Sequence, residues 1–407
     1  MPASLEVPGD ASTLSEAVDR IDDGGVISIV GQLETGAVQI RKPITLRGGT
    51  LVGTDAIVLG LHADVIIEDC AIENDQGHGV VAMAGSPVLR RLSLRVAQTA
   101  FACGAQAQPA LYGCEVSTCA IGLTAQDDAA PTVDGLTVVS SGSGMFFTGR
   151  SAGQVNNVGI VAGGMPAVEI NAEATPEFEG VAVALGGGGG FFVHGQARPR
   201  LLRCSAERTQ LAAVEVRGQA DPTIDGLKVR DCQASGLFLH ENATGTYMAL
   251  DIEGCLLASI EVAEHAQVEI EEGSLLDGQQ GGLWVHDDAH LEAIGLEIAG
   301  HALMGVDVLD RAHVVLDGCE IARNGSGVQV GSGRVETIEC NVLGNRGAGV
   351  RVLTTGVAAL EGGRVAENSG AALDAIEGGR IRITPDVLIE GEQRCDDLSE
   401  IVRVEGD

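Results

Sequence analysis

One short pattern recurs along almost the whole chain and limits what the chain can fold into. It reads apolar, any, any, Cys/Leu/Val, any, apolar, as in residues 67–72 (IEDCAI), 111–116 (LYGCEV) and 316–321 (LDGCEI). Its fourth position returns every 21 to 23 residues, at fifteen places: Cys70, Leu92, Cys114, Leu136, Val158, Val181, Cys204, Leu227, Leu250, Gly273, Leu296, Cys319, Cys340, Gly363 and Asp386. A fixed period of this length is typical of a solenoid, in which each repeat forms one coil and packs on its neighbours.

A second segment in each repeat alternates apolar with other residues and often begins with Gly or Ala, as in 190–193 (GFFV), 236–239 (GLFL) and 282–285 (GLWV). Alternation with period two predicts a strand with one buried face. Many repeats close on a turn that contains Pro, such as Pro131 or Pro222. Because no helical periodicity lies between these segments, we predict an all-β, single-stranded right-handed parallel β-helix of about fifteen coils of 21–23 residues.

The two ends of the chain depart from the repeat. Thr13 and Glu16 form a capping-box pattern, which predicts a short capping helix that ends near Ile21 and is followed by a strand over 26–30. At the other end, Pro385 and the polar stretch 392–400 predict that the strand ladder stops. We therefore expect an N-terminal cap and first coil over residues 1–48, a parallel β-helix over 49–390, and a C-terminal cap or tail over 391–407.

Charge and composition exclude several classes of function. The chain of 407 residues carries 25 basic and 57 acidic side chains, a formal charge of −32, which disfavours binding to nucleic acid or to anionic lipid. No run approaches the ~18 apolar residues of a membrane span, and the acidic N-terminus does not resemble a secretory signal. We expect a cytoplasmic protein.

Ten cysteines agree with a reducing compartment. Five of them occupy the fourth position of the pattern, where a small apolar side chain faces the interior: Cys70, Cys114, Cys204, Cys319 and Cys340. Cys103 alternates inward on the second segment. Cys114 and Cys119 have the spacing of a metal or redox pair, but both fit the repeat, so we favour structural roles for them.

The segment 13–49 (TLSEAVDRIDDGGVISIVGQLETGAVQIRKPITLRGG) resembles the first coil of the pectin-lyase-like right-handed parallel β-helix superfamily, in particular its Beta_helix/NosD-like group. The later units are similar to its carbohydrate-binding and sugar-hydrolase (CASH-type) repeats. This resemblance implies the β-helix fold but no single activity, because the group contains polysaccharide lyases, hydrolases, epimerases, periplasmic metal-delivery proteins and non-catalytic adaptor modules. The closely spaced Asp clusters of its pectate lyases and polygalacturonases are missing from this sequence.

One outward-facing position of the second segment alternates between aromatic and acidic residues. In chain order it is occupied by Phe146, Glu169, Phe192, Glu215, Phe238, Glu261, Trp284 and Asp307. Two residues further along, a second outward column holds His194, His240 and His286 in three of the four aromatic repeats. Exposed aromatics in a row are uncommon on soluble monomers unless something binds there. The alternative is an old two-coil duplication without function, or aromatics covered by a loop.

We interpret this face as a binding surface for a protein partner or an extended polymer such as a glycan. Its predicted contact residues are Phe146, Glu169, Phe192, His194, Phe238, Trp284, His286 and Asp307. The first hypothesis is a non-catalytic binding or scaffold module. The alternative is a polysaccharide-binding, hydrolase or lyase-type enzyme, with Glu215 and Glu261 as acid and base and His240 between them as proton carrier. A remote third alternative is an acidic mimic of DNA. Near-translational symmetry argues against one asymmetric catalytic centre, and the oligomeric state stays open.

A third column places carboxylates on four consecutive coils, at Glu241, Glu264, Asp287 and Asp310. Such carboxylates repel one another, and a hard cation such as Ca²⁺ relieves the repulsion. A solvated acidic edge without any cofactor is the alternative that we favour. Within VHDDAH, the side chains of His286, Asp287, Asp288 and His290, with His313 one coil away, have the composition of a transition-metal cluster.

Overall fold

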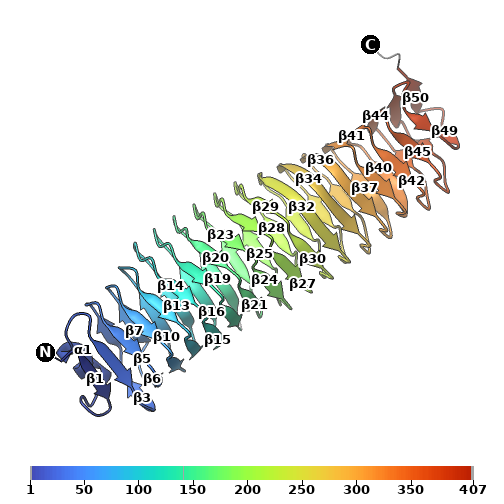
Figure 1. Ribbon diagram of the computed structural model, residues 1–407. Coiled ribbons are helices and arrows are strands. Elements are labelled where there is room, and N and C mark those ends of the chain that lie inside the picture. The colour runs from blue at the N-terminus through green and yellow to red at the C-terminus, as the bar shows by residue number, and fades with distance from the viewer. Residues whose placement is uncertain (1, 141, 405–407) are drawn as a thin grey trace. The chain divides into compact units, whose positions relative to one another are not determined.

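The computed structural model describes residues 2–140 and 142–404. The chain divides into two compact units, of which unit 1 comprises residues 1–192 and 196–205 and unit 2 comprises residues 193–195 and 206–407. In each unit the chain winds into successive coils, and each strand pairs in parallel with the equivalent strand of the next coil (Figure 1). Both units are therefore parallel β-helices, as the repeat predicts.

Unit 1 contains three sets of short strands, one set for each side of the coil. After β1 (Ser4–Val7) and β2 (Val26–Ile29), the first set is β5 (Thr45–Arg47), β8 (Ile66–Glu68), β11 (Val88–Arg90), β14 (Ala110–Tyr112), β17 (Thr132–Asp134), β20 (Gln154–Asn156), β23 (Glu177–Glu179) and β26 (Arg200–Leu202). The second set is β3 (Gln32–Thr35), β6 (Thr50–Gly53), β9 (Ala71–Asn74), β12 (Ser93–Val96), β15 (Glu115–Thr118), β18 (Thr137–Val139), β21 (Gly159–Val161) and β24 (Ala182–Ala184). The third set is β4 (Val38–Ile40), β7 (Ile57–Leu61), β10 (His78–Ala82), β13 (Thr99–Cys103), β16 (Ile121–Ala125), β19 (Ser143–Phe147) and β22 (Val168–Ile170), followed by β25 (Phe191–Val193).

Unit 2 repeats this arrangement. Its first and second sets are β29 (Thr223–Asp225), β30 (Lys228–Arg230), β32 (Thr246–Glu253), β34 (Gln267–Leu276), β36 (His290–Ala299), β38 (His313–Asp317), β39 (Glu320–Ala322), β41 (Arg334–Ile338), β42 (Asn341–Leu343), β44 (Val357–Glu361), β45 (Arg364–Ala366), β47 (Arg380–Ile383), β48 (Leu388–Ile389) and β50 (Glu400–Arg403), after β27 (Ser205–Glu207). Its third set is β28 (Val214–Val216), β31 (Leu237–Leu239), β33 (Ile260–Val262), β35 (Leu283–Val285), β37 (Met304–Val308), β40 (Ser326–Val330), β43 (Val350–Val352), β46 (Leu373–Ala375) and β49 (Gln393–Cys395).

The described residues thus hold 17 strands of the third set, two more than the fifteen coils that the sequence pattern predicts. Both additional coils precede Cys70 and carry β4 and β7.

The fourth position of the repeat faces the interior, as predicted, wherever Cys, Leu or Val occupies it, whereas Asp386 is exposed. Cys70, Leu136 and Leu227 are at most 2% exposed. Nine of the ten cysteines are free and buried, Cys114 and Cys119 among them, and Cys395 is exposed. A glycine before several third-set strands is explained by close packing of the coils. A Cβ atom on Gly282 would lie 2.3 Å from Cγ2 of Ile298.

A buried ladder of polar side chains in unit 2 was not predicted. The backbone N–H of Asn324 donates to Oδ1 of Asn345 at 2.9 Å, and the N–H of Asn345 donates to Oδ1 of Asn368 at 3.0 Å. The N–H of His301 donates in the same way to Asn324 at 3.0 Å. These side chains satisfy backbone groups at the turn that leads into the third set, where no strand partner is present.

The short N-terminal helix forms as predicted. α1 (Leu14–Arg20) begins after Thr13, whose Oγ1 accepts the N–H of Glu16 at 3.2 Å. The Glu16 carboxylate accepts in return the N–H of Ser12 at 2.9 Å. Leu14, Ala17 and Val18 are buried on the side of the helix that packs against β1 and β4. Among the described residues, no helix is long and apolar enough to cross a membrane.

The prediction that the strand ladder stops near Pro385 is wrong. β48, β49 and β50 continue the parallel pairing with β45, β46 and β47. Pro385 lies in the turn between β47 and β48, where its missing N–H costs no ladder hydrogen bond. The division into a cap over 1–48, a β-helix over 49–390 and a tail over 391–407 stays a prediction.

Candidate functional site

The alternating aromatic and acidic residues lie on the third set of strands in each unit. In unit 2, strand pairing places five of them opposite one another on successive coils: Glu215, Phe238, Glu261, Trp284 and Asp307. We call these five residues the aromatic–acid column. Consecutive members are one strand spacing apart, about 4.8 Å. In unit 1, Phe146 lies opposite Glu169 in the same way, and Phe192 lies on β25.

The aromatic rings of the column are less exposed than the sequence predicts. Phe238 and Trp284 are half-buried. Each ring packs on the histidine two residues further along its own strand. The ring of Phe238 stacks on His240 with centroids 4.1 Å apart, and Trp284 lies 4.6 Å from His286 with the rings tilted by 34°. The faces of these rings are therefore shared between the protein and the surface.

The glutamates of the column interact with the histidine of the next coil. Nε2 of His240 lies 3.3 Å from Oε1 of Glu215, and Nε2 of His286 lies 3.5 Å from Oε1 of Glu261. Ser235 also donates its hydroxyl to Glu261 at 2.7 Å. The neighbouring carboxylate of Glu261 is the main cause that raises the pKa of His286.

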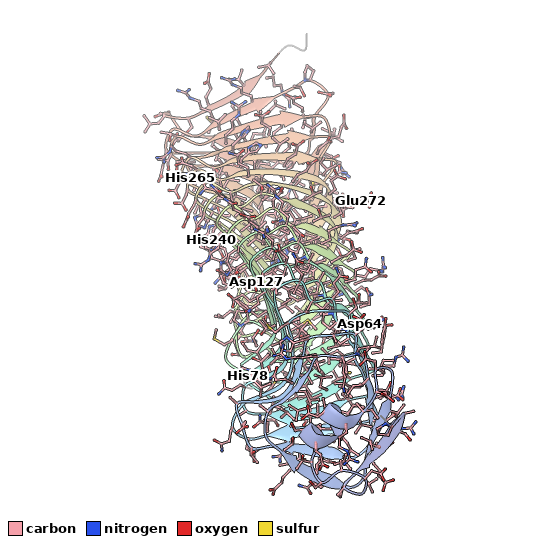
Figure 2. The ribbon with its side chains drawn as sticks, turned by 90° about the vertical axis from the view of Figure 1, so that its left-hand side faces the viewer. Asp64, His78, Asp127, His240, His265 and Glu272 are labelled. Carbon is pink, nitrogen blue, oxygen red and sulfur yellow. The ribbon has the colours of Figure 1, made fainter. Side chains whose placement is uncertain are left out.

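His240, predicted as a proton carrier between two catalytic acids, thus contacts Glu215, while Glu261 has its own histidine. Figure 2 shows His240 and His265 on one side of unit 2 and Glu272 on the other. His194 lies in the turn after β25, and Glu169 and Phe192 are half-buried.

Asp307 ends the column in a different environment. Its Oδ1 accepts a hydrogen bond from Nε2 of Gln329 on β40 at 3.2 Å. Burial is the main cause that raises the pKa of this carboxyl above its usual value. A pocket of about 190 Å³ opens beside it, lined by Ala258, Gln280, Gly281, Leu283, Trp284, Leu303, Met304, Asp307 and Leu309. We call this cavity the Trp284 pocket.

Exposed leucines border the column, and the sequence analysis did not identify them. Leu211 is 56% exposed and Leu303 is 49% exposed. Each leucine lies three residues before an inward-facing valine of the third set, Val214 on β28 and Val306 on β37. Leu257 occupies the same place on the coil of β33, beside Leu256, which is 44% exposed. Leu211, Leu257 and Leu303 are spaced by 46 residues, the two-coil period of the acids, so this signal is present in the sequence.

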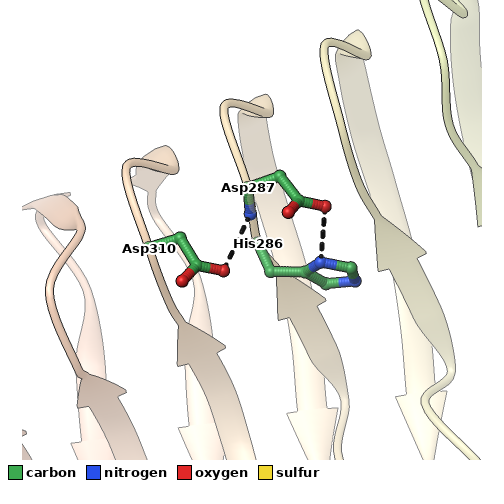
Figure 3. A group of neighbouring side chains, drawn as sticks. All are labelled: His286, Asp287 and Asp310. Carbon is green, nitrogen blue, oxygen red and sulfur yellow. Dashed lines mark hydrogen bonds and ion pairs between the residues drawn. The ribbon is translucent and has the colours of Figure 1, made fainter.

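The third column of acids has a role in the turns. Glu241, Glu264, Asp287 and Asp310 all adopt a positive φ between 57° and 60°. Oδ2 of Asp287 accepts the N–H of Glu264 at 3.2 Å. Oδ2 of Asp310 accepts the N–H of Asp287, also at 3.2 Å (Figure 3). Asp287 and Asp310 therefore each bond the backbone of the preceding coil.

The structure brings two of the four predicted calcium ligands together. Ligand atoms of His286, Asp287 and Asp310 lie within 4.8 Å of one another, and Nδ1 of His286 is 3.0 Å from Oδ2 of Asp287. Glu241 instead lies 3.9 Å from Arg217. The Ca²⁺ site over Glu241, Glu264, Asp287 and Asp310 stays a prediction.

The residues of VHDDAH do not form one cluster. Asp288 pairs with Arg311, whose Nη2 lies 2.6 Å from its carboxylate. His290 packs on His313 with ring centroids 4.9 Å apart, and His313 in turn lies 3.1 Å from Glu336. Within this segment, the side chains of His286 and Asp287 interact with each other, at 3.0 Å.

Comparison with known proteins identifies the family. A sequence model described as "Right handed beta helix region" matches residues 100–248 and 212–365, which together are more than half of the chain. The chain belongs to this right-handed β-helix family. No curated protein matches it in sequence.

Several solved structures are similar to this β-helix protein at low sequence identity. Vag8, solved in "the Vag8-C1 inhibitor complex", aligns over 99% of both chains at 12% identity and a TM-score of 0.50. ORF18 of Geobacillus virus E2 aligns over 72% of this chain and 62% of its own at 13% identity, with a TM-score of 0.36. The periplasmic alginate epimerase AlgG aligns over 98% of this chain and 85% of its own at 10% identity, with a TM-score of 0.34. The protein thus spans less than two thirds of the viral chain, and these likenesses concern the fold alone.

Proposed function

We propose that this β-helix protein is a non-catalytic binding module whose aromatic–acid column contacts an elongated protein partner. The observation that carries the proposal is the strict alternation of Glu215, Phe238, Glu261, Trp284 and Asp307 in register on five neighbouring strands. A repeated row of half-buried aromatics and carboxylates suits a partner that makes the same contact on several coils. Exposed Leu211 and Leu303 beside the row add apolar area.

The environment of the acids supports binding rather than catalysis. Glu215 and Glu261 lie two strand spacings apart, about 10 Å at the backbone. Each interacts with its own histidine, at 3.3 Å and 3.5 Å. A hydrolase needs two carboxyls with different roles at one bond, whereas each of these two lies beside a histidine of the next coil. The fold is compatible with protein binding, since Vag8 shares it and is bound to C1 inhibitor in its structure.

A carbohydrate-binding or carbohydrate-active protein is the second candidate. Trp284 favours it, because a half-buried indole between Glu261 and Asp307 offers a stacking face flanked by hydrogen-bond acceptors.

We also infer a cytoplasmic location, because nine buried free thiols suit a reducing compartment.

The test compares capture of partners by three forms of the immobilised protein. The face variant Leu211→Ser/Leu303→Ser changes exposed leucines beside the column, and its matched control Leu388→Ser/Leu398→Ser changes leucines that are 52% and 80% exposed elsewhere in unit 2. We expect a protein that the wild type and the control retain and the face variant loses. That protein, once purified, should bind the wild type directly. Equal capture by all three forms, with binding of soluble glycans in its place, contradicts the proposal.

A further inference from the structure

The walls of the Trp284 pocket are mainly apolar, and they carry a single charged group. Leu283, Leu303, Met304 and Leu309 contribute apolar surface, and the indole of Trp284 contributes an aromatic one. Asp307 is the only charged side chain among the residues that line it. At about 190 Å³ the pocket is smaller than the ~300–1,000 Å³ of a site for a whole small-molecule ligand. Its size suits the end of one side chain.

The carboxylate of Asp307 has little compensation inside the protein. It accepts a hydrogen bond from the neutral amide of Gln329, and burial disfavours its charged form. The charged group that faces it from the preceding coil is His286, which is itself held by Glu261 and Asp287. An ionised carboxylate in apolar surroundings favours the entry of a cation. The face of an indole attracts cations as well.

We propose that the Trp284 pocket binds an organic cation, the aliphatic ammonium or guanidinium end of a lysine or arginine side chain that projects from a basic polypeptide. This inference rests on the binding function proposed above and names the chemistry of the partner. The aliphatic stem of such a side chain packs on Leu303, Met304 and Leu309, while its charge meets Asp307 and the face of Trp284. The formal charge of −32 on the chain is complementary to a basic partner.

The sole tryptophan of the chain reports on this pocket directly. We would titrate the protein at constant ionic strength with choline, with its uncharged isostere 3,3-dimethylbutan-1-ol and with an end-blocked heptalysine peptide, and record the emission of Trp284. We expect a saturable change with choline and with heptalysine but not with the alcohol. Heptalysine should bind at least about tenfold more tightly than choline, because several side chains meet the acidic face at once.

Two variants make the test specific. Asp307→Asn keeps the shape of the side chain and removes its charge, so it should weaken the affinity for choline about tenfold or more, a loss of one charge-assisted contact. Glu269→Gln removes an exposed carboxylate on β34, outside the pocket, and should leave the affinity for choline unchanged. Both variants are first shown to have the wild-type circular dichroism spectrum.

The outcomes separate this inference from the binding function. An equal response to the alcohol, or an equal loss in both variants, overturns the cation site. Choline binding as tightly as heptalysine overturns the assignment to a polypeptide side chain. If the cation site fails while the Leu211→Ser/Leu303→Ser variant still loses its partner, the binding function stands alone. If choline binds while no form captures a partner, the binding function fails and the pocket remains.

Discussion

Carboxylates at equivalent positions of the column differ in their environment, because different side chains surround them. Glu215 and Glu261 each lie within 3.5 Å of an imidazole nitrogen. Asp307 accepts from the amide of Gln329 and is partly buried beside leucine and methionine side chains. Its raised pKa means that the folded state binds this proton more tightly than the unfolded chain does. The protonated form stabilises the fold below the unfolded pKa, and this stabilisation is lost as the pH rises through the folded pKa.

Asp307→Asn should therefore stabilise the protein at neutral pH. Asparagine avoids the partly buried charge, and its Oδ1 can still accept from Gln329. We expect the free energy of unfolding to rise by less than about 1 kcal/mol, the usual range for a partly exposed site. The difference should shrink below about pH 4, where the wild-type carboxyl is protonated in both states. Urea unfolding at several pH values measures this. A variant that is less stable than the wild type at neutral pH contradicts the argument.

At the scale of the element, Asp287 and Asp310 of the third column link the turns that follow β33, β35 and β37. A non-glycine residue with φ near 60° is uncommon, and Asp and Asn tolerate this conformation better than most. Asp310 adds a hydrogen bond to the backbone of the preceding coil. This geometry gives Asp287 and Asp310 a structural role in the turns.

Asp310→Ala should destabilise the protein by about 1–2 kcal/mol, because it removes the acceptor for the N–H of Asp287. Asp310→Asn keeps an acceptor oxygen and should cost less than about 0.5 kcal/mol. We expect millimolar Ca²⁺ to leave the midpoint of thermal unfolding unchanged in the wild type and in both variants. A midpoint that rises with Ca²⁺ in the wild type and not in Asp310→Asn would instead establish the predicted calcium site.

The half-buried aromatics belong to the element scale as well. Replacing Phe238 or Trp284 by Ala should cost about 1–3 kcal/mol of stability, because it removes the packing of the ring on its histidine. A fully buried ring would cost ~3–5 kcal/mol, whereas these two rings are half-buried. Tyr112→Ala, at a ring that is 38% exposed on β14, is the control and should cost less than about 1 kcal/mol. Chemical unfolding of the three variants gives these values. Losses equal to that of Tyr112→Ala would show that the rings are free, as the sequence alone suggests.

The sequence predicts the coils well because interior positions recur at a fixed interval, so that Cys70 and Leu227 mark the same place on different coils. It predicts less of the site. Alternation indicates that Phe238 faces outward, but the stack on His240 depends on side-chain directions along the strand. The ladder of Asn324, Asn345 and Asn368 escapes detection because an asparagine at a turn is ordinary in any loop.

At the scale of the whole molecule, nearly all of the ten thiols are buried. Nine lie in the interior, where burial raises the pKa of Cys70 and of Cys103 to about 12, and only Cys395 is exposed. A thiol reagent at neutral pH should modify one cysteine per native chain and ten in denaturant. Cys395→Ser should abolish the native reaction. Modification of several cysteines in the native protein at a similar rate would contradict the buried ladder.

The net charge of the whole chain affects the association rate of a basic partner more than its dissociation rate. A formal charge of −32 attracts cationic chains over a Debye length of about 10 Å at 0.1 M salt, whereas contacts inside the Trp284 pocket are shielded from salt. The association rate constant of heptalysine should therefore fall about tenfold or more between about 20 and 200 mM NaCl, while its dissociation rate constant changes little. Asp307→Asn should instead change the dissociation rate. Heptalysine should dissociate faster from this variant than from the wild type, while its association rate should depend on salt as in the wild type. Stopped-flow fluorescence of Trp284 separates the two rates. Association that is insensitive to salt would mean that the acidic surface does not attract the ligand and that the pocket recognises it by shape alone.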